Sequence, residues 1–263
     1  MSNVSVPSVQ TGLVPAALEE RVEQVRAALA GALRSRVIGP DAEDKQARVM
    51  LAPGERWFAE SSPVRTVHSD ASMFIGGMRA LLLQSLHPLA MAGVAEHSDY
   101  RNDPWGRLQR TAEFLAATTF GPAELAQQSV DMVRAVHSRV HGVTADETPY
   151  SASDPHLLRW VHVAEADSFL TAYQAYGAGR LSPAEADGYV AGMALIARKL
   201  GVTAPPLSVR GLHDQLAMFR PELRSTPQSR DAARYLLLEP PLDAAADRKS
   251  TRLNSSHLVI SYA

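Results

Sequence analysis

Residues 71–97, ASMFIGGMRALLLQSLHPLAMAGVAEH, form a long apolar stretch that decides the fold class of this chain. Leu, Ala and Met dominate it, and these residues have high helix propensity. The stretch predicts one long buried helix, which Pro88 should kink beside His87. The pair Gly76 and Gly77 lowers helix propensity by about 1 kcal/mol per residue relative to Ala, which predicts close packing against another helix or a cofactor.

Outside this stretch, apolar residues recur at helical spacing and alternating, strand-like runs are almost absent. Asp154 and Ser182 each precede a proline, which places an N-cap side chain directly before the first helical residue. We expect an all-α fold, a single globular multi-helix bundle with a buried cofactor pocket. It should span residues 15–246 and follow a disordered N-terminus at residues 1–14. The pattern predicts further helices at residues 15–36, 104–119, 122–141, 155–177, 183–201, 209–219 and 227–238.

The composition excludes several classes of protein. The 263 residues are 46% hydrophobic and 21% charged, which is a globular profile. Lys and Arg number 26 against 28 Asp and Glu, so no basic excess exists for nucleic acid. The chain has no cysteine, which leaves His, carboxylates and hydroxyls for chemistry. The first residues have neither a cationic start nor an apolar run, so we expect a cytoplasmic location without an integral membrane segment.

The last residues, 247–263, differ in style from the Ala-, Leu- and Arg-rich sequence before them. A common DNA-sequencing adapter, translated in this frame, encodes residues 247–257 and, after two residues from an index, residues 260–263. We interpret this tail as an adapter-derived artefact, which removes His257 from the candidate ligands. We therefore expect the natural sequence to depart from this one after Ala246.

A first candidate site is the run VRAVHSRVH at residues 133–141. Arg134, His137 and His141 stand at positions i, i+3 and i+7, which is one face of a helix. A solvated basic stripe would give the same spacing. The neighbouring valines indicate that the helix is partly buried, and a buried histidine needs a partner.

A second candidate site is the run GRLQRT at residues 106–111. Arg107, Arg110 and Thr111 share a helical face, and two guanidinium groups with a hydroxyl suit an anionic group such as a carboxylate. Surface ion pairs with Asp103 or Glu113 are the plainer alternative. The two runs together describe a haem pocket, with a histidine as axial ligand, arginines on the propionates and apolar walls.

Other histidines and other chemistries stay open at this point. His137 and His141 also have the i, i+4 spacing of a metal site, which Glu165 or Asp167 would complete for a metal-dependent hydrolase. Arg134 and Arg139 would repel such an ion. The pocket would equally serve a protein that stores or senses haem or a lipid without catalysis. His162 fits a core or a pocket position equally well, and His87 fits a hydrogen-bonded core position.

Four linked runs resemble a known family. GGMRALLLQSLHPLAMAGVAEHSDYRNDPWGRLQRT, VHSRVHG, YSASDPHLLRWVHVAEADSFLTAYQAYG and LSPAEADGY are similar in order and spacing to the catalytic domain of the MpaB/rubber-oxygenase (latex-clearing protein) family. The resemblance covers residues 56–238. It implies an all-helical, iron-containing oxidoreductase that binds haem b and acts with O2 on an apolar, isoprenoid- or lipid-like small molecule. We do not expect polymeric rubber as the substrate, because secreted rubber oxygenases carry export signals and the first residues here do not resemble one.

The resemblance also implies roles for individual residues. An Arg-x-x-His-x-x-x-Arg pattern of the family falls on Arg134, His137 and His141, which makes His137 the implied proximal ligand of the haem iron. The last position is histidine here instead of arginine. A distal Arg-x-x-Lys-Thr pattern falls on Arg107, Arg110 and Thr111. Because an arginine stays protonated, Arg110 should not bind the iron, and the sixth position would stay open for O2.

Overall fold

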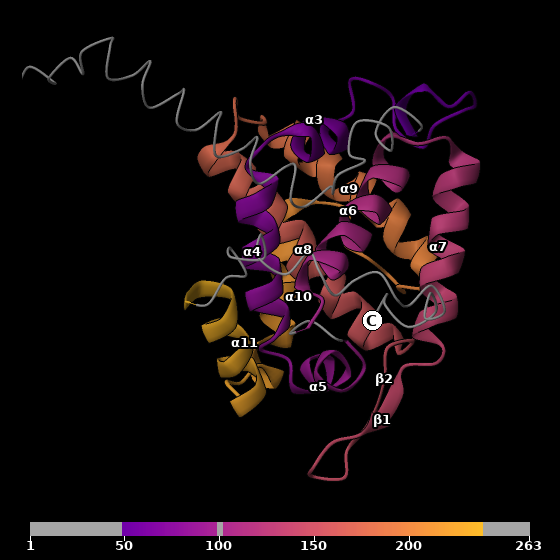
Figure 1. Cartoon of the computed structure of the whole chain (residues 1–263). Helices are drawn as coiled ribbons and strands as arrows, with labels where there is room; N and C mark the ends of the chain where they lie inside the picture. The colour runs from indigo at the N-terminus through magenta and orange to yellow at the C-terminus, as the bar shows by residue number, and fades with distance from the viewer. Residues whose placement is uncertain (1–48, 99–101, 239–263) are drawn as a thin grey trace, which may run out of the picture.

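Helices make up most of the part of the chain that the structure, a computed structural model, describes, which is residues 49–98 and 102–238 (Figure 1). The predicted all-α class is confirmed. The predictions for residues 1–14, 15–36 and 247–263 lie outside the described residues. The helices are α3 (Pro63–Ser69), α4 (Met73–Gln84), α5 (Pro88–His97), α6 (Pro104–Phe120), α7 (Ala123–His137), α8 (Pro155–Tyr176), α9 (Pro183–Leu200), α10 (Val209–Phe219), the 3-10 helix η1 (Arg220–Glu222) and α11 (Pro227–Leu238).

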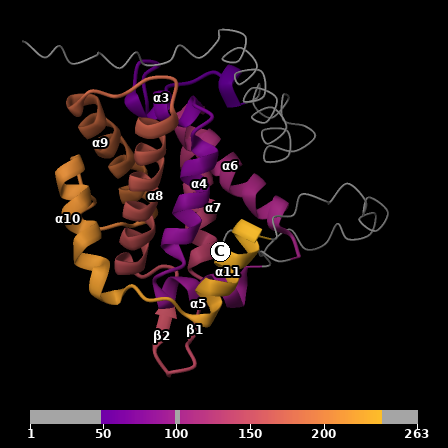
Figure 2. The ribbon, with the colours of Figure 1, turned by 90° about the vertical axis from the view of Figure 1, so that its left-hand side faces the viewer.

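The core is built around α8, whose neighbours include α3, α4, α9 and α10 (Figure 2). Trp160 of α8 is fully buried, and its Nε1 donates a hydrogen bond to the carbonyl oxygen of Gln84 at 3.2 Å. The predicted N-caps are confirmed. Asp154 accepts from the backbone N–H of His156 at the start of α8, and Ser182 forms a capping box with Glu185 at the start of α9.

The prediction of one long helix over residues 71–97 is wrong, because this stretch forms two helices. α4 ends at Gln84 and α5 begins at Pro88, with His87 as its N-cap at φ −87° and ψ 115°. A residue before proline is driven out of the α region by the proline ring, so His87 adopts an extended backbone. Pro88 then serves as the first residue of a new helix, where its missing N–H costs nothing.

Helices α4 and α8 pack closely, as Gly76 predicted (Figure 2). A Cβ atom at Gly76 would lie 2.7 Å from Cδ1 and 3.0 Å from Cα of Phe169, which no side chain can occupy without displacement. Nearby on α4, Arg79 lies 2.6 Å from Oδ2 of Asp167 and donates to Oγ of Ser168 at 2.7 Å. A helix contact and a charged pair therefore fix the same interface.

Helices α6 and α7 are consecutive, packed helices joined at Gly121 and Pro122. The helix predicted over residues 122–141 ends at His137, which is a correction. Beyond it the chain forms a two-stranded antiparallel hairpin of β1 (His141–Val143) and β2 (Pro149–Ser151), in which Gly142 pairs with Tyr150. Val140 accepts a hydrogen bond from the N–H of Ala152 at 2.9 Å, so the hairpin, not a further helical turn, satisfies this backbone.

Candidate functional site

The two predicted clusters lie on α6 and α7, two consecutive helices that pack on each other. Arg107 lies about four turns before the link at Gly121, and His137 lies about four turns after Pro122. Arg107 and His137 therefore each lie in the half of their helix that is farther from the link. Arg110 and Thr111 follow Arg107 within about one helical turn of α6.

The α6 cluster is already hydrogen-bonded. Arg107 is half-buried and donates from Nη1 to Oγ of Ser98 at 2.6 Å. Arg110 donates from Nη1 to Oδ2 of Asp103 at 3.2 Å, so the ion pair that sequence analysis held as the plainer alternative exists. The Thr111 hydroxyl is exposed and donates to the carbonyl oxygen of Arg107 at 3.1 Å. These contacts leave one face of α6 carrying two guanidinium groups and a hydroxyl.

The α7 cluster differs from the prediction of a single helical face. His137 is the last residue of α7 and is half-buried, whereas Arg134 is exposed and donates from Nη1 to the carbonyl oxygen of Lys199 at 3.1 Å. His141 is exposed on β1. The predicted shared face of His141 with Arg134 and His137 is wrong, because the helix ends before it reaches His141.

The alternative metal site loses its geometric basis for the same reason. His137 and His141 are not on successive turns of one helix. Within the described residues, neither belongs to a group of three side chains close enough to share a metal ion. Asp167, which would have completed the set, is paired with Arg79.

We call three ionisable side chains the core polar groups: His162, which is buried, and His68 and Glu165, which are partly buried. His68 bonds through Nδ1 to Oγ1 of Thr119 at 2.8 Å and through Nε2 to the Tyr189 hydroxyl at 3.4 Å. Burial lowers the pKa of His68 to about 3 and that of His162 to about 4, so both are neutral near pH 7. Burial also raises the pKa of Glu165 to about 7.

His162 and Glu165 stand one turn apart on α8, so they share a face of this helix. Nε2 of His162 is buried without a hydrogen-bond partner among the described residues. The sequence alone predicts a core or pocket position for His162 and considers Glu165 only as a metal ligand. The signal that would have paired them is their i, i+3 spacing within an otherwise apolar helix segment.

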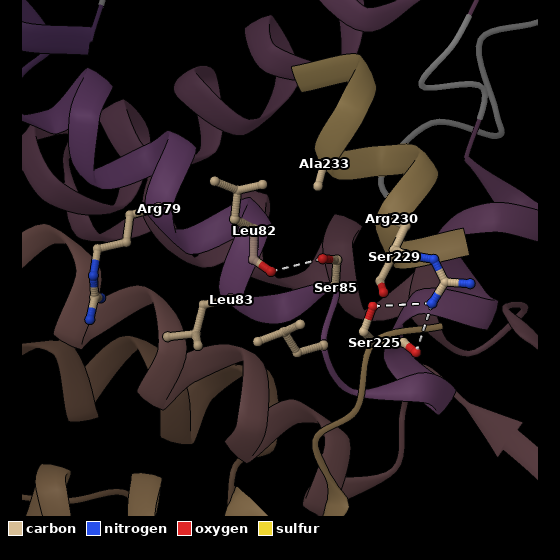
Figure 3. Close-up of a pocket in the computed structure, with 9 residues that line it drawn as sticks. Arg79, Leu82, Leu83, Ser85, Ser225, Ser229, Arg230 and Ala233 are labelled. Atoms are coloured by element: carbon tan, nitrogen blue, oxygen red, sulfur yellow. Dashed lines mark hydrogen bonds between the residues drawn. The ribbon is translucent and has the colours of Figure 1, made fainter. Parts of the chain in front are cut away.

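A separate pocket of about 350 Å³ lies between α4 and α11 (Figure 3). Apolar side chains from both helices line it, and Arg79 and Arg230 add polar groups. Both arginines are engaged, Arg79 with Asp167 and Arg230 with the carbonyl oxygen of Ser225 at 3.3 Å. The lining of the pocket is mostly apolar, and none of the predicted site residues contributes to it.

Glu96 on α5 is hydrogen-bonded to a side chain of the β-hairpin. It accepts a hydrogen bond from the hydroxyl of Tyr150, a buried residue of β2 that also contacts Nε2 of His97 at 3.2 Å. Burial and the hydrogen bond to Glu96 raise the pKa of Tyr150 to about 12. These bonds dock the β-hairpin on α5.

Comparison with known proteins gives one match. A family model described as ER-bound oxygenase mpaB/B'/Rubber oxygenase, catalytic domain, matches residues 65–259. The matched range includes most of the described helices and runs on into the tail that we interpret as adapter-derived. No curated protein and no solved structure matches the chain. In the described part of the chain, no helix is both long enough and apolar enough to cross a membrane.

Proposed function

The chain belongs to the MpaB/rubber oxygenase catalytic-domain family, and from this membership we propose that it is an oxygenase that uses haem b and O2 to oxidise an apolar small molecule. The substrate class is an isoprenoid- or lipid-like compound. The expected cytoplasmic location stays part of the proposal. The observation that carries it is the family match, and the position of Arg107, Arg110 and His137 on two consecutive, packed helices supports it.

The chemistry of these donors fits a haem group. His137 offers an imidazole nitrogen, the ligand that most often holds haem iron, from a half-buried position at the end of α7. Arg107 and Arg110 offer guanidinium groups, which bind carboxylates such as haem propionates. Arg134 supports the site indirectly by tying α7 to Lys199 at the end of α9. His141 enters the proposed cofactor-binding set through the family pattern alone, because it lies on β1 outside the helical face of His137.

Haem b, when bound, supplies the redox chemistry that activates O2. Arg110 keeps its proton and therefore donates hydrogen bonds without competing for the iron. The Thr111 hydroxyl, now bonded to the backbone of its own helix, can rotate to donate to an oxygen atom at the site. Asp103 holds Arg110 in place, so the pair positions the guanidinium before any ligand arrives.

The test is the absorbance spectrum of the chain purified from haem-supplemented cells, with and without residues 247–263, together with a pyridine haemochrome assay. We expect one haem b per chain, and we expect His137→Ala to abolish the Soret band. His213→Ala, an exposed histidine on α10, is the matched control and should keep it. A folded wild-type protein that shows only protein absorbance would refute the proposal.

Two further measurements distinguish an oxygenase from a haem-storing or haem-sensing protein and from a metal-dependent hydrolase. Uptake of O2 that depends on an added apolar alkene supports an oxygenase, whereas haem without O2 uptake indicates storage or sensing. Equal loss of a bound metal ion in His137→Ala and His141→Ala, without a Soret band, would instead revive the hydrolase alternative.

A further inference from the structure

Three side chains outside the proposed haem site converge from distant parts of the chain. His87 caps α5, His156 lies in the first turn of α8, and Glu222 ends η1. Nε2 of His156 lies 2.8 Å from Oε2 and 3.0 Å from Oε1 of Glu222, and Nε2 of His87 lies 3.1 Å from the same Oε2. One ligand atom from each residue lies within 4.8 Å of the other two.

We propose that His87, His156 and Glu222 form a binding site for a divalent transition-metal ion, with Zn²⁺ as the best match to the ligand set. Two imidazole nitrogens and one carboxylate form a common protein set for such ions, and a water molecule completes the coordination. Ligand atoms 2.0–2.1 Å from a tetrahedral Zn²⁺ stand about 3.3 Å apart. The two nitrogen-to-Oε2 distances of 2.8 and 3.1 Å therefore require only a small outward movement of the Glu222 carboxylate from each imidazole.

Buried aromatic surroundings distinguish this site from a chance contact between surface side chains. His87 is 2% exposed, and its ring lies 6.1 Å from that of Trp160 and 6.4 Å from that of Phe219. The His156 ring lies 4.7 Å from the same Phe219 ring. These aromatic rings fix the direction of both imidazoles, as a preformed metal site requires.

The open side of the site gives an ion its entry. The side chains of His156 and Glu222 are 45% and 40% exposed, so an ion can reach the ligands and keep a water molecule. Arg224 is the neighbouring cation, but its side chain is 65% exposed and its Nη2 lies 3.8 Å from Oδ2 of Asp146. Solvent and that carboxylate therefore weaken the repulsion between Arg224 and a bound ion.

A bound ion would fasten η1, and with it the end of α10, to the first turns of α5 and α8. The competing explanation is a tether of hydrogen bonds, in which both imidazoles donate to the Glu222 carboxylate without any metal. The two explanations differ in zinc affinity, so zinc binding decides between them. The haem proposal is independent of this one, since none of the three residues belongs to the proposed haem site.

The experiment is a titration of the full chain with Zn²⁺ after dialysis against EDTA, followed by calorimetry and by zinc analysis, with Mg²⁺ as the comparison ion. We expect one Zn²⁺ per chain and no response to Mg²⁺. His156→Ala and Glu222→Gln should each weaken zinc binding by at least about tenfold, because loss of a ligand costs no less than loss of an outer-shell partner. His213→Ala should bind as the wild type does.

The chosen variants keep the test decisive. His156 and Glu222 are exposed, and Gln at position 222 retains an amide oxygen that can accept a hydrogen bond. Circular dichroism and the melting temperature verify that each variant is folded. Co²⁺ in place of Zn²⁺ adds a visible absorption band that both variants should lose. Zinc affinity that is absent from the wild type, or unchanged in the two variants, would leave the tether as the explanation.

Discussion

Glu165 is an acid in a position that disfavours its charge. Burial raises its pKa in the folded protein to about 7, from 4.5. The folded chain therefore holds a proton that the unfolded chain releases between pH 4.5 and about 7, and stability from this group falls as the pH rises through that window. We expect Glu165→Gln to raise the melting temperature at pH 8, with a gain of about 1–3 kcal/mol in unfolding free energy that disappears at pH 5.

Thermal unfolding followed by circular dichroism at pH 5 and pH 8 tests this, and Glu60→Gln, at an exposed position, controls for the loss of one charge. A gain of the same size at both pH values would mean that the charge of Glu165 is not what destabilises the fold.

Single residues were predictable from the sequence where the signal was local. The caps Asp154 and Ser182 were predictable because a cap depends only on the residues that follow it. The environments of His68 and Glu165 were not, because they depend on distant side chains such as Thr119 and Tyr189, which only the fold brings near.

The α4–α8 interface supplies a matched pair of substitutions. A Cβ at Gly76 would collide with Phe169 at 2.7 Å from Cδ1, whereas at Gly77 the nearest atom of Phe169 is Cε1 at 3.9 Å, an ordinary contact. Both glycines lie in the same helix, so alanine gives the same propensity gain of about 1 kcal/mol at each. We expect Gly77→Ala to stabilise the protein and Gly76→Ala to destabilise it by about 1–3 kcal/mol.

Urea unfolding curves of the two variants measure this difference directly. The prediction depends on the sign of the difference, so Gly76→Ala must be the less stable protein. Equal stability in the two variants would mean that α4 and α8 can separate at no cost.

Helix ends were harder to predict than helices. Val133, Val136 and Val140 fit one face of the helix predicted over residues 122–141, and they indicated that this helix is partly buried. Val140 is indeed buried, at 5% exposure, but it lies outside the helix, directly before β1. A buried valine at this spacing is compatible with a continued helix and also with a chain that leaves the helix for the β-hairpin. The sequence alone does not distinguish the two conformations. The prediction therefore placed His141 on the helix incorrectly, whereas its placement of His137 on the helix is correct.

At the scale of the whole molecule, the core polar groups set how stability depends on pH. His68 and His162 have folded pKa values of about 3 and about 4, below the value of 6.5 in the unfolded chain. Burial also lowers the pKa of His87, though hydrogen bonding to Glu222 opposes the shift. As the pH falls below 6.5, these histidines become protonated in the unfolded chain while they stay neutral in the folded protein. Protonation therefore favours the unfolded chain, and the free energy of unfolding decreases as the pH falls below 6.5.

Between pH 4.5 and about 7, the raised pKa of Glu165 makes the protein less stable as the pH rises, which is opposite to the effect of the histidines. At least two histidines contribute, so their effect on the free energy of unfolding is the larger one. We therefore expect the haem-free chain to be most stable near pH 6.5, with a steep loss towards pH 5 and a shallow loss towards pH 8. Urea midpoints at these three pH values measure the profile. His162→Gln should reduce the acid-side loss, because it removes one of the two titrating core histidines. A wild-type midpoint at pH 5 that equals or exceeds the one at pH 6.5 would show that His68 and His162 are not held neutral in the folded protein, and the buried positions assigned to them would then be wrong.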